Sequence, residues 1–507
     1  MILLANLLRA TTSCDANWKG TMTMTLTDLV MAEPLYIGGT WRGAAGVPID
    51  VIDPADERVL ATVPSATATE VHEALITARD AQTAWARTPS VVRGHYLRAI
   101  AELIRAHRDR LAELVVSEVG KPAAQAAAEV DFAAEFLSYN AEWDRRLEGE
   151  TLPADDRGEL IQLSHAPLGV VVAICPWNFP LAVLCRKLGP ALITGNTVVV
   201  KPSEISPLST IDLFRLIDAE LDLPPGVLNL VTGAAQTGQA LVEDITTAIV
   251  SFTGHRDTGK AIMALAASNL TRVALELGGK APAIVWRDAD LDVAVPAIVA
   301  ARHVNSGQVC TSAERVFVHD ELYEPFLDAY VAAVQRLTLG HPSGVVDMGP
   351  LASAHQLAKT SLAVETAISE GAELIIGGGA PTDASMRQGY WYAPTVLRNV
   401  RPDMTVMREE TFGPVTPVLS VSTVEQAISF ANDSRYGLSA YVFSRDYQTV
   451  MRAVEELQFG EIYINRTLGE SIHAHHAGYR ESGIGGEDGK WGLLRYTQIK
   501  TAYHHYG

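Results

Sequence analysis

The chain has 507 residues, enough for two or three domains with sizeable cores. Its 40 Lys and Arg residues against 59 Asp and Glu residues give a net charge of −19, which argues against nucleic acid or an anionic membrane as a partner. The four cysteines show neither a CxxC pair nor the Cys/His spacing of a zinc site, so we expect no disulfide framework, no metal and a reducing, cytoplasmic location.

The first 31 residues have a composition of their own. The apolar start at Ile2 lacks a preceding basic segment, and no Ala-x-Ala cleavage site follows it. We therefore interpret residues 1–31 as a disordered leader rather than a signal peptide. No apolar run in the chain reaches the ~18 residues that a membrane-spanning helix needs.

Residues 36–144 show a hairpin followed by helical patterns. Tyr36 to Trp41 reads as a hairpin with Gly38-Gly39 in its turn. Apolar residues recur at helical spacing over 68–85 and again over 97–114, where we expect a single helix that stops before Gly120 and Pro122. An alanine-rich third helix is expected to run to about residue 143.

The polar segment 145–166 and the last residues of the chain are expected to be β-structure outside the main sheets. The first is typical of a projecting hairpin, although a plain surface loop fits its composition as well. The second, residues 497–504, alternates in the manner of an edge strand.

Short β-rich runs alternate with helical patterns from residue 170 onwards, which predicts parallel βαβ units and an α/β fold. The runs cover 170–174, 197–200, 227–231, 248–252 and 273–277. Ligands bind at the carboxyl ends of such strands, and the informative polar residues follow these runs. A second α/β block covers 278–466 with Cys310 near its entrance, so we expect the active site between the two blocks.

Three residues form a candidate set for acyl chemistry. Cys310 lies in an uncharged octapeptide, 305–312, and its thiolate would be a strong nucleophile. Glu276, in an apolar run before two glycines, would be a usable base if burial raised its pKa. Asn178, between prolines and aromatics, can donate to an oxyanion. Each also has a plainer interpretation: a small buried hydrophobe, a strand-end carboxylate and a rigid turn.

The segment Gly254 to Ala261 satisfies the pattern G-x-x-x-x-G-K of a P-loop. Ala261 stands where Ser or Thr must hold magnesium, so a nucleotide-hydrolysing site is not expected. A glycine-rich turn that opens a helix suits a dinucleotide pyrophosphate, and an ordinary strand-to-helix turn is the alternative.

Several motifs occur together in one order: PWNFP (176–180), KPSE (201–204), FTG (252–254), LELGGK (275–280), NSGQVC (305–310), EETFGPV (409–415) and SGIGG (482–486). In these motifs the chain resembles the aldehyde dehydrogenase superfamily from about residue 36 to its end. The resemblance implies an NAD-binding Rossmann-type domain over 32–144 and 167–277 and a catalytic domain over 278–466. It also implies an oligomerisation element of 145–166 with 495–507, an active-site tail over 467–494, and a homodimer or homotetramer.

The resemblance also implies roles. Cys310 would attack an aldehyde, Asn178 and the Cys310 N–H would hold the oxyanion, and Glu276 would activate water. Lys187 and Glu487 match residues that relay protons, with an interdomain salt bridge as the alternative. The residues implied for the cofactor, which is expected to be NAD, are Trp177, Lys201, Pro202, Ser203, Glu204, Gln239, Gly254, His255, Lys359, Glu410 and Phe412.

Two of these positions bear on cofactor choice. Glu204 would accept hydrogen bonds from the adenine ribose and repel the 2′-phosphate of NADP, although Lys201 and Glu204 also fit a surface ion pair. His255 stands where the family often has Ser, so its contacts with the pyrophosphate are expected to differ.

The substrate follows from the tail, 468–478, which resembles the lactaldehyde and glycolaldehyde dehydrogenase branch. Arg186, Glu470 and His476 match that branch's contacts to substrate oxygens, so we expect NAD-dependent oxidation of a small hydroxyaldehyde, with Arg186 on one wall of the substrate tunnel and Glu470 and His476 on the other. A semialdehyde dehydrogenase that clamps a carboxylate with Arg186 is one alternative. A thiol hydrolase that pairs Cys310 with His303 is another. His473, His475 and His476 also fit a metal-binding tract or a solvated loop.

Overall fold

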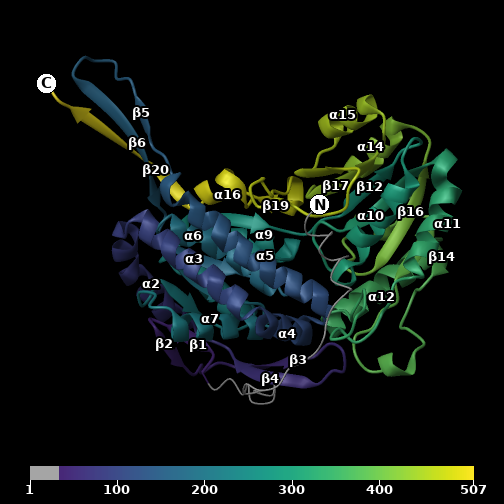
Figure 1. Cartoon of the computed structure of the whole chain (residues 1–507), viewed down its shortest axis with the longest axis horizontal. Helices are drawn as coiled ribbons and strands as arrows, with labels where there is room; N and C mark the ends of the chain where they lie inside the picture. The colour runs from purple at the N-terminus through teal and green to yellow at the C-terminus, as the bar shows by residue number, and fades with distance from the viewer. Residues whose placement is uncertain (1–32) are drawn as a thin grey trace.

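The computed structural model describes residues 33–507, so the predicted leader lies outside the described residues. Within 33–507 the strands form sheets of eight, seven, three and two strands. Figure 1 shows two lobes side by side and a β-arm that projects from the first. The predicted α/β fold class is confirmed.

The first lobe begins with two hairpins. β1 (Leu35–Ile37) and β2 (Thr40–Arg42) form the predicted hairpin, which adds to one edge of the eight-stranded sheet through the pairing of β1 with β9. β3 (Pro48–Ile52) and β4 (Val59–Pro64) form the two-stranded sheet.

Four helices follow, one more than the sequence indicated. α2 (Ala68–Arg87) begins with a capping box between Thr67 and Glu70. The single helix expected over 97–114 is wrong: α3 (Ser90–Ala106) and α4 (Arg108–Val119) are separated at His107. Both helices bury leucines and isoleucines in the same core, so the apolar periodicity continues across the break. α4 ends at Gly120, and α5 (Ala123–Ala141) leads into the 3₁₀ turn η2 (Glu142–Arg145).

The eight-stranded sheet has the order β19-β11-β10-β7-β8-β9-β1-β2. Its central strands β7 to β11 are mutually parallel, as predicted. The order reverses between β7 and β10, and a crevice at such a switch point is where open parallel sheets bind ligands. The elements are β7 (Val170–Ile174), α6 (Pro180–Ile193), β8 (Thr197–Lys201), α7 (Leu208–Glu220), β9 (Leu228–Leu230), α8 (Ala235–Glu243), β10 (Thr247–Thr253), α9 (Arg256–Ala266), η3 (Ala267–Asn269), β11 (Arg272–Glu276) and β19 (Gly483–Ile484).

The seven-stranded sheet of the second lobe has the order β14-β15-β16-β13-β12-β17-β18, with β14 antiparallel to the others. Its elements are β12 (Ala281–Val285), α10 (Leu291–His303), η4 (Val304–Gly307), β13 (Ala313–His319), η5 (Asp320–Leu322), α11 (Tyr323–Val334), α12 (Ala354–Ser369), β14 (Glu373–Ile376), η6 (Ala384–Met386), β15 (Thr395–Arg398), α13 (Thr405–Arg408), β16 (Val415–Val421), α14 (Val424–Asn432), β17 (Ser439–Phe443), α15 (Tyr447–Glu456) and β18 (Glu461–Ile464).

The arm is a three-stranded antiparallel sheet. β5 (Glu150–Leu152) and β6 (Glu159–Pro167) form a hairpin rather than an irregular loop, and β20 (Thr497–His505) pairs along β6 as the predicted edge strand. η7 (Arg480–Ser482) and α16 (Gly489–Leu494) connect the lobes to β20.

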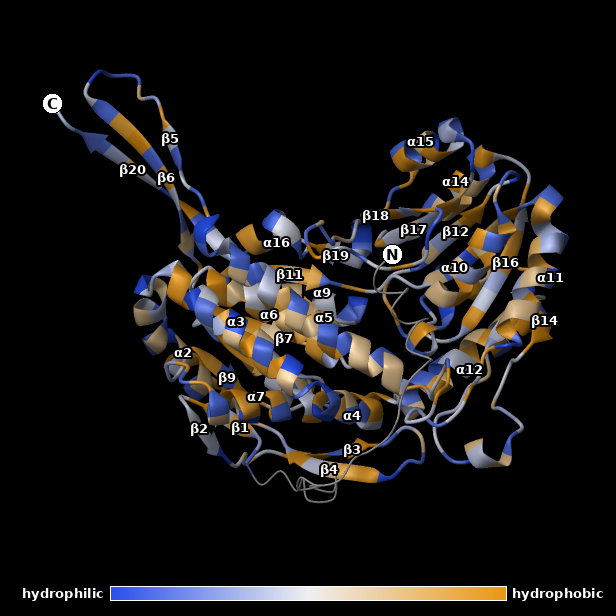
Figure 2. Cartoon of the chain, in the orientation of Figure 1, coloured by the Kyte–Doolittle hydropathy of each residue, from blue (hydrophilic) through white to orange (hydrophobic). Residues whose placement is uncertain are grey.

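The cores lie on both faces of the two large sheets. Every residue of β7, β8, β12, β13 and β17 is buried, as in parallel sheets covered by helices on both sides. Figure 2 shows hydrophobic and hydrophilic residues alternating along the covering helix α3. Among the described residues, no helix has the length and apolar character required to span a bilayer.

Candidate active site

A cavity of about 570 Å³ lies between the two lobes. The first lobe contributes residues that follow strands β7, β10 and β11. The second contributes residues that precede its strands, because Cys310 comes before β13 and Phe412 before β16. The predicted residues that line it are Trp177, Asn178, Arg186, Gly254, His255, Glu276, Cys310, Lys359, Glu410, Phe412, Glu470 and His476.

The backbone before Cys310 makes a left-handed turn. Asn305, Ser306 and Gly307 have φ values of 49°, 56° and 78°. Such conformations are costly for residues other than glycine and persist where neighbours hold them. Asn305 N–H donates to Gln125 Oε1 at 2.8 Å, and the Ser306 hydroxyl donates to a backbone carbonyl at 2.8 Å. A Cβ on Gly307 would lie 2.6 Å from a backbone carbonyl, so the turn also needs glycine for space.

Among the cysteines of the described residues, Cys310 is the one whose thiol is accessible from the cavity. It is partly exposed to the cavity, whereas Cys175 and Cys185 are buried. Burial raises the pKa of the Cys175 thiol to about 12 and that of Cys185 further still. Asn178 lies beside Cys310 because its Nδ2 donates to the Gln308 carbonyl at 2.9 Å. An amide has two N–H groups, so the second stays available to a substrate oxygen.

The loop that carries Asn178 is itself held by a buried ion pair. Lys121 Nζ donates to the Asn178 carbonyl at 2.8 Å and contacts Glu129. Glu129 Oε1 accepts the N–H of Leu181 at 3.0 Å at the start of α6. This clamp keeps the amide in place against the Cys310 loop.

Glu276 ends strand β11 with a carboxylate that has no hydrogen-bond partner among the described residues. The residue is 3% exposed, and burial raises the pKa of its carboxyl to about 8. Its Oε2 lies 3.8 Å from His476 Nε2. A buried, unpartnered carboxyl in this range suits a general base near neutral pH.

Lys187 and Glu487 form an ion pair behind the cavity wall. Lys187 Nζ lies 2.5 Å from Glu487 Oε1 and donates to the Thr253 hydroxyl at 2.7 Å. Neither side chain lines the cavity, so the pair lies one layer outside it. Glu487 Oε2 has no hydrogen-bond partner within the described part of the chain.

Arg186 and Glu470 are in contact, which corrects the expectation that they stand on opposite walls. Arg186 Nη2 lies 2.9 Å from Glu470 Oε1 and 2.9 Å from Asp488 Oδ2. Burial opposes ionisation of Glu470, but Arg186 holds the pKa of that carboxyl at about 2. Sequence reasoning missed Asp488, whose proximity to Arg186 depends on the packing of the C-terminal tail.

The three tail histidines lie in different surroundings and do not converge on one metal. His473 is exposed, while His475 Nδ1 lies 3.1 Å from the Glu487 carbonyl. His476 is buried, with Nδ1 3.2 Å from Glu461 Oε1. Among the described residues, no group of three or more His, Cys, Asp or Glu side chains is placed to hold a metal. Glu461 was also missed.

His303 does not line the cavity, so the alternative of a thiol hydrolase that pairs Cys310 with His303 is wrong. It ends α10, its Nδ1 lies 2.9 Å from the Val299 carbonyl, and it does not line the cavity. Burial lowers the pKa of its imidazole to about 3. The left-handed turn separates His303 from Cys310, so the two do not share a helix.

The other end of the cavity fits a nicotinamide cofactor. The rings of Trp177 and Phe412 stand edge to face with centroids 5.5 Å apart. Glu410 Oε1 accepts the Gly279 N–H at 2.8 Å, and a Cβ on Gly278 would lie 2.5 Å from this carboxylate. The helix α9 begins beside the cavity with His255 as its N-cap, which suits a pyrophosphate.

The P-loop interpretation fails in the structure as well. α9 starts at Arg256, so Lys260 lies inside the helix rather than in a phosphate-binding loop. Its Nζ lies 2.9 Å from Glu481 Oε1.

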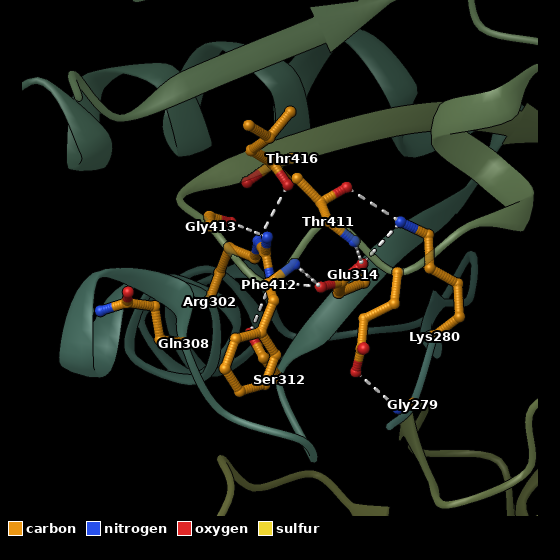
Figure 3. Close-up of polar contacts among 12 residues, drawn as sticks. Gly279, Lys280, Arg302, Gln308, Ser312, Glu314, Thr411, Phe412, Gly413 and Thr416 are labelled. Atoms are coloured by element: carbon orange, nitrogen blue, oxygen red, sulfur yellow. Dashed lines mark hydrogen bonds and ion pairs between the residues drawn. The ribbon is translucent and has the colours of Figure 1, made fainter. Parts of the chain in front are cut away.

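A buried carboxylate, Glu314, organises the loop that carries Glu410 and Phe412 (Figure 3). Its oxygens accept the Thr411 N–H at 2.9 Å and the Phe412 N–H at 2.7 Å. They also lie 2.6 Å from Lys280 Nζ and 3.5 Å from Arg302 Nη1. Burial opposes ionisation, but these two cations hold the pKa of Glu314 at about 2. Sequence reasoning missed this network, because its members come from four segments.

Some predicted cofactor residues lie outside the cavity lining: Lys201, Pro202, Ser203, Glu204 and Gln239. Lys201 is buried and donates to the Gly233 carbonyl at 2.7 Å, with Glu204 Oε2 at 3.6 Å. Gln239 is exposed and donates to Glu243 at 2.9 Å. The Lys201–Glu204 pair is therefore not purely a surface pair, because its cation is buried.

Comparison with known proteins agrees with this geometry. The model of the aldehyde dehydrogenase family matches residues 41–502. Lactaldehyde dehydrogenase of Escherichia coli is 46% identical over 93% of this chain and 98% of its own. A crystal structure of the E. coli lactaldehyde dehydrogenase superposes with a TM-score of 0.91 at 44% identity, covering 93% of this chain and 99% of that one.

Relatives named for other aldehydes also match. D-glyceraldehyde dehydrogenase (NADP(+)) of Thermoplasma acidophilum is 38% identical over 94% of this chain and 97% of its own. Betaine aldehyde dehydrogenase of Staphylococcus aureus, solved in complex with NAD+, has a TM-score of 0.92 at 35% identity, covering 95% of this chain and 97% of that one. The relatives thus share a reaction type and differ in aldehyde and cofactor.

Proposed function

Because the chain belongs to the aldehyde dehydrogenase family, we propose that it oxidises a small hydroxyaldehyde, lactaldehyde or glycolaldehyde, to the carboxylic acid with NAD. One observation carries the substrate class. The Arg186–Glu470 pair lines the same cavity as Cys310 and Glu276.

The chemistry follows from the positions of three side chains. The Cys310 thiolate attacks the aldehyde carbon, and the free N–H of the Asn178 amide stabilises the oxyanion together with the Cys310 N–H. After oxidation of this adduct to a thioester, Glu276 takes a proton from water. The activated water attacks the thioester carbon and releases the acid. The desolvated position of Glu276 supports this role.

NAD would be held at the end of the cavity opposite the substrate, by Trp177, Gly254, His255, Lys359, Glu410 and Phe412. When bound, the nicotinamide supplies the hydride acceptor. We assign Lys201, Pro202, Ser203, Glu204 and Gln239 to the adenosine end. Glu204 favours NAD over NADP, since its carboxylate would repel a 2′-phosphate.

Lys187 and Glu487 are proposed to carry the proton of Glu276 away from the site. Lys187 is fully buried and bonded to Glu487 and Thr253, which connects the interior to the tail of the chain. The Lys187–Glu487 ion pair also connects the first lobe to the C-terminal tail, so it has a structural role in addition to the proposed proton transfer.

The charges around Arg186 favour a hydroxyl over a carboxylate. Glu470 and Asp488 both lie 2.9 Å from Arg186 Nη2, so the guanidinium already has acidic partners, and one of them, Glu470, lines the cavity. A semialdehyde would place its carboxylate beside that of Glu470, and the repulsion between the two negative charges would weaken its binding. A hydroxyl can donate to Glu470 and accept from Arg186, and His476 completes the polar wall. An aromatic aldehyde would leave these groups unpaired, at ~1–3 kcal/mol each.

The test is NADH formation with a panel of aldehydes. We expect kcat/KM to fall from lactaldehyde or glycolaldehyde, through succinic semialdehyde, to benzaldehyde, with at least a tenfold step to benzaldehyde. Arg186→Leu should reduce the difference in kcat/KM between the hydroxyaldehydes and benzaldehyde. Cys310→Ala provides the background rate of NADH formation. Higher kcat/KM for benzaldehyde than for both hydroxyaldehydes would refute the substrate class.

We also propose a homodimer or homotetramer that forms through the arm, and a cytoplasmic enzyme. The edge strand β20 exposes Ile499 and Tyr503 by 65% and 77%, and an isolated three-stranded arm gains stability when its edge is paired. The eight-stranded sheet would form the cofactor domain and the seven-stranded sheet the catalytic domain. Sedimentation of Ile499→Lys/Tyr503→Lys against wild type tests the assembly, and an unchanged mass would contradict it.

A further inference from the structure

Helix α5 and the turn before it contact both loops of the proposed oxyanion site. The turn has a fixed backbone, because Gly120 ends α4 with a φ of 77° and Pro122 is the N-cap of α5. Lys121 lies between them with a fully buried side chain. Gln125 and Glu129 follow on α5 four residues apart, so they share one face of the helix. We call Lys121, Gln125 and Glu129 the α5 triplet.

Lys121 and Glu129 hold the loop that carries Asn178. The Lys121 ammonium has three N–H groups, and it has three partners. It donates to Glu129 Oε2 and, at 2.8 Å, to the Asn178 carbonyl, and its Nζ lies 3.6 Å from the centre of the Phe179 ring in a cation–π contact. Glu129 Oε1 accepts the Leu181 N–H at 3.0 Å. The pair therefore fixes the backbone at Asn178 and again just beyond it.

Gln125 holds the other loop, the one that carries Cys310. Its Oε1 accepts the Asn305 N–H at 2.8 Å, within the left-handed turn. Asn305 Nδ2 in turn donates to the Asn178 carbonyl at 3.2 Å, and Asn178 Nδ2 donates to the Gln308 carbonyl at 2.9 Å. The two loops are therefore bonded to each other and to the same face of α5.

We propose that the α5 triplet positions the oxyanion site: it sets the Asn178 amide and the Cys310 N–H at the spacing at which both can donate to one substrate oxygen. The inference rests on the proposed function, which assigns those two donors to the oxyanion. None of the triplet lines the cavity, so these are positioning residues that touch neither substrate nor cofactor. Such donors stabilise charge because they are held in place before the reaction, and a shift of about 1 Å can cost about 100-fold in rate.

Fold stability alone does not account for a buried charge pair at this place. Apolar residues of similar volume often give equal or greater stability, because burying two charges removes both from water. Hydrogen bonds provide what apolar contacts lack, which is a fixed distance and direction for each partner. The Lys121–Glu129 pair applies that property at the start of α6 and in the loop before it, where the position of one side-chain amide decides the chemistry.

The test is acylation of Cys310 by p-nitrophenyl acetate in the full-length protein, without aldehyde or cofactor. The thiolate attacks the ester carbon, the C=O π bond becomes an oxyanion, and the adduct expels p-nitrophenolate to leave an acetyl thioester. With the protein in excess over the ester, p-nitrophenolate release reports this step alone. The rate is expressed per folded molecule, with the folded fraction taken from circular dichroism.

We expect Asn178→Ala to lower the acylation rate by about 100-fold, because it removes one oxyanion donor. Lys121→Met should lower it by about 10- to 100-fold through misplacement of that donor. Glu129→Gln should act in the same direction with a smaller effect, since Lys121 keeps its hydrogen bond to the Asn178 carbonyl.

A double variant separates positioning from a merely structural role. Once Asn178→Ala has removed the amide, Lys121→Met should lower the rate by less than about a further twofold, whereas a structural role would give the same factor in both backgrounds. Glu118→Gln is the matched control. Glu118 is a buried carboxyl that accepts the Leu208 N–H at 2.7 Å at the start of α7, as Glu129 does at the start of α6, and its variant should keep wild-type acylation.

Acylation by Lys121→Met within about twofold of wild type, or equal factors in both backgrounds, would overturn the proposal. If Lys121→Met does not fold, Glu129→Gln, which keeps the side-chain volume, decides the question in the same cycle. An incorrect substrate or cofactor would change the aldehyde panel and leave these rates unchanged. Wild-type acylation by Cys310→Ala or Asn178→Ala would contradict the proposed mechanism and the positioning role together.

Discussion

The Glu314→Gln substitution tests whether a buried carboxylate holds the Glu410–Phe412 loop. It removes the charge that faces Lys280 and Arg302, whose side chains are fully buried. Breaking a buried ion pair by removing one partner costs about 3–5 kcal/mol. Lys280 escapes part of that cost by losing its proton, since burial already lowers the pKa of its amine to about 8. We therefore expect a loss of about 3 kcal/mol in the free energy of unfolding.

Urea unfolding measures this loss, with the midpoint expected to fall by roughly 1 M for an m-value of about 3 kcal/mol/M. NAD binding should weaken as well, because the N–H groups of Thr411 and Phe412 lose a charged acceptor. Glu373→Gln is the matched control: its ion pair with Arg398 is 3.1 Å long but largely exposed, and such pairs contribute below about 1 kcal/mol. If Glu314→Gln destabilises the protein no more than Glu373→Gln, the reasoning about the network is wrong.

Four further predictions concern Cys310, Glu276 and Glu204. Cys310→Ala should abolish NADH formation and leave NAD affinity, measured by calorimetry, within about twofold; wild-type turnover in this variant would exclude the thiolate mechanism. Glu276→Gln should keep a pre-steady-state burst of NADH and slow the later turnover, whereas loss of the burst would place Glu276 before acylation. Because burial raises the folded pKa of Glu276 from 4.5 to about 8, its contribution to stability is complete below about pH 4.5 and is lost as the pH rises through 8; wild type should therefore lose more stability than Glu276→Gln between pH 6 and 9. Glu204→Ala should raise kcat/KM with NADP relative to NAD, and an unchanged ratio would remove Glu204 from cofactor selection.

Local patterns in the sequence were enough to predict the parallel strands and the loops that carry the candidate site. The run Val170–Ile174 is apolar throughout because helices cover both faces of its sheet, so its burial can be recognised from its composition alone. Cys310, Glu276 and Asn178 could be identified as a set, since each lies in a short segment whose neighbours are informative on their own. The break at His107 was not visible, because apolar spacing continues across it.

Only the tertiary structure decided which charges meet. Asp488 and Glu470 reach Arg186 from the far end of the chain, and Glu461 reaches His476 across the gap between β18 and the tail. Periodicity and turn chemistry report on neighbours within a few residues, whereas these contacts depend on how two sheets and a tail pack together. The pKa that sets the chemistry of Glu276 comes from that packing, because burial and the nearby charges exist only once the lobes have closed around the cavity.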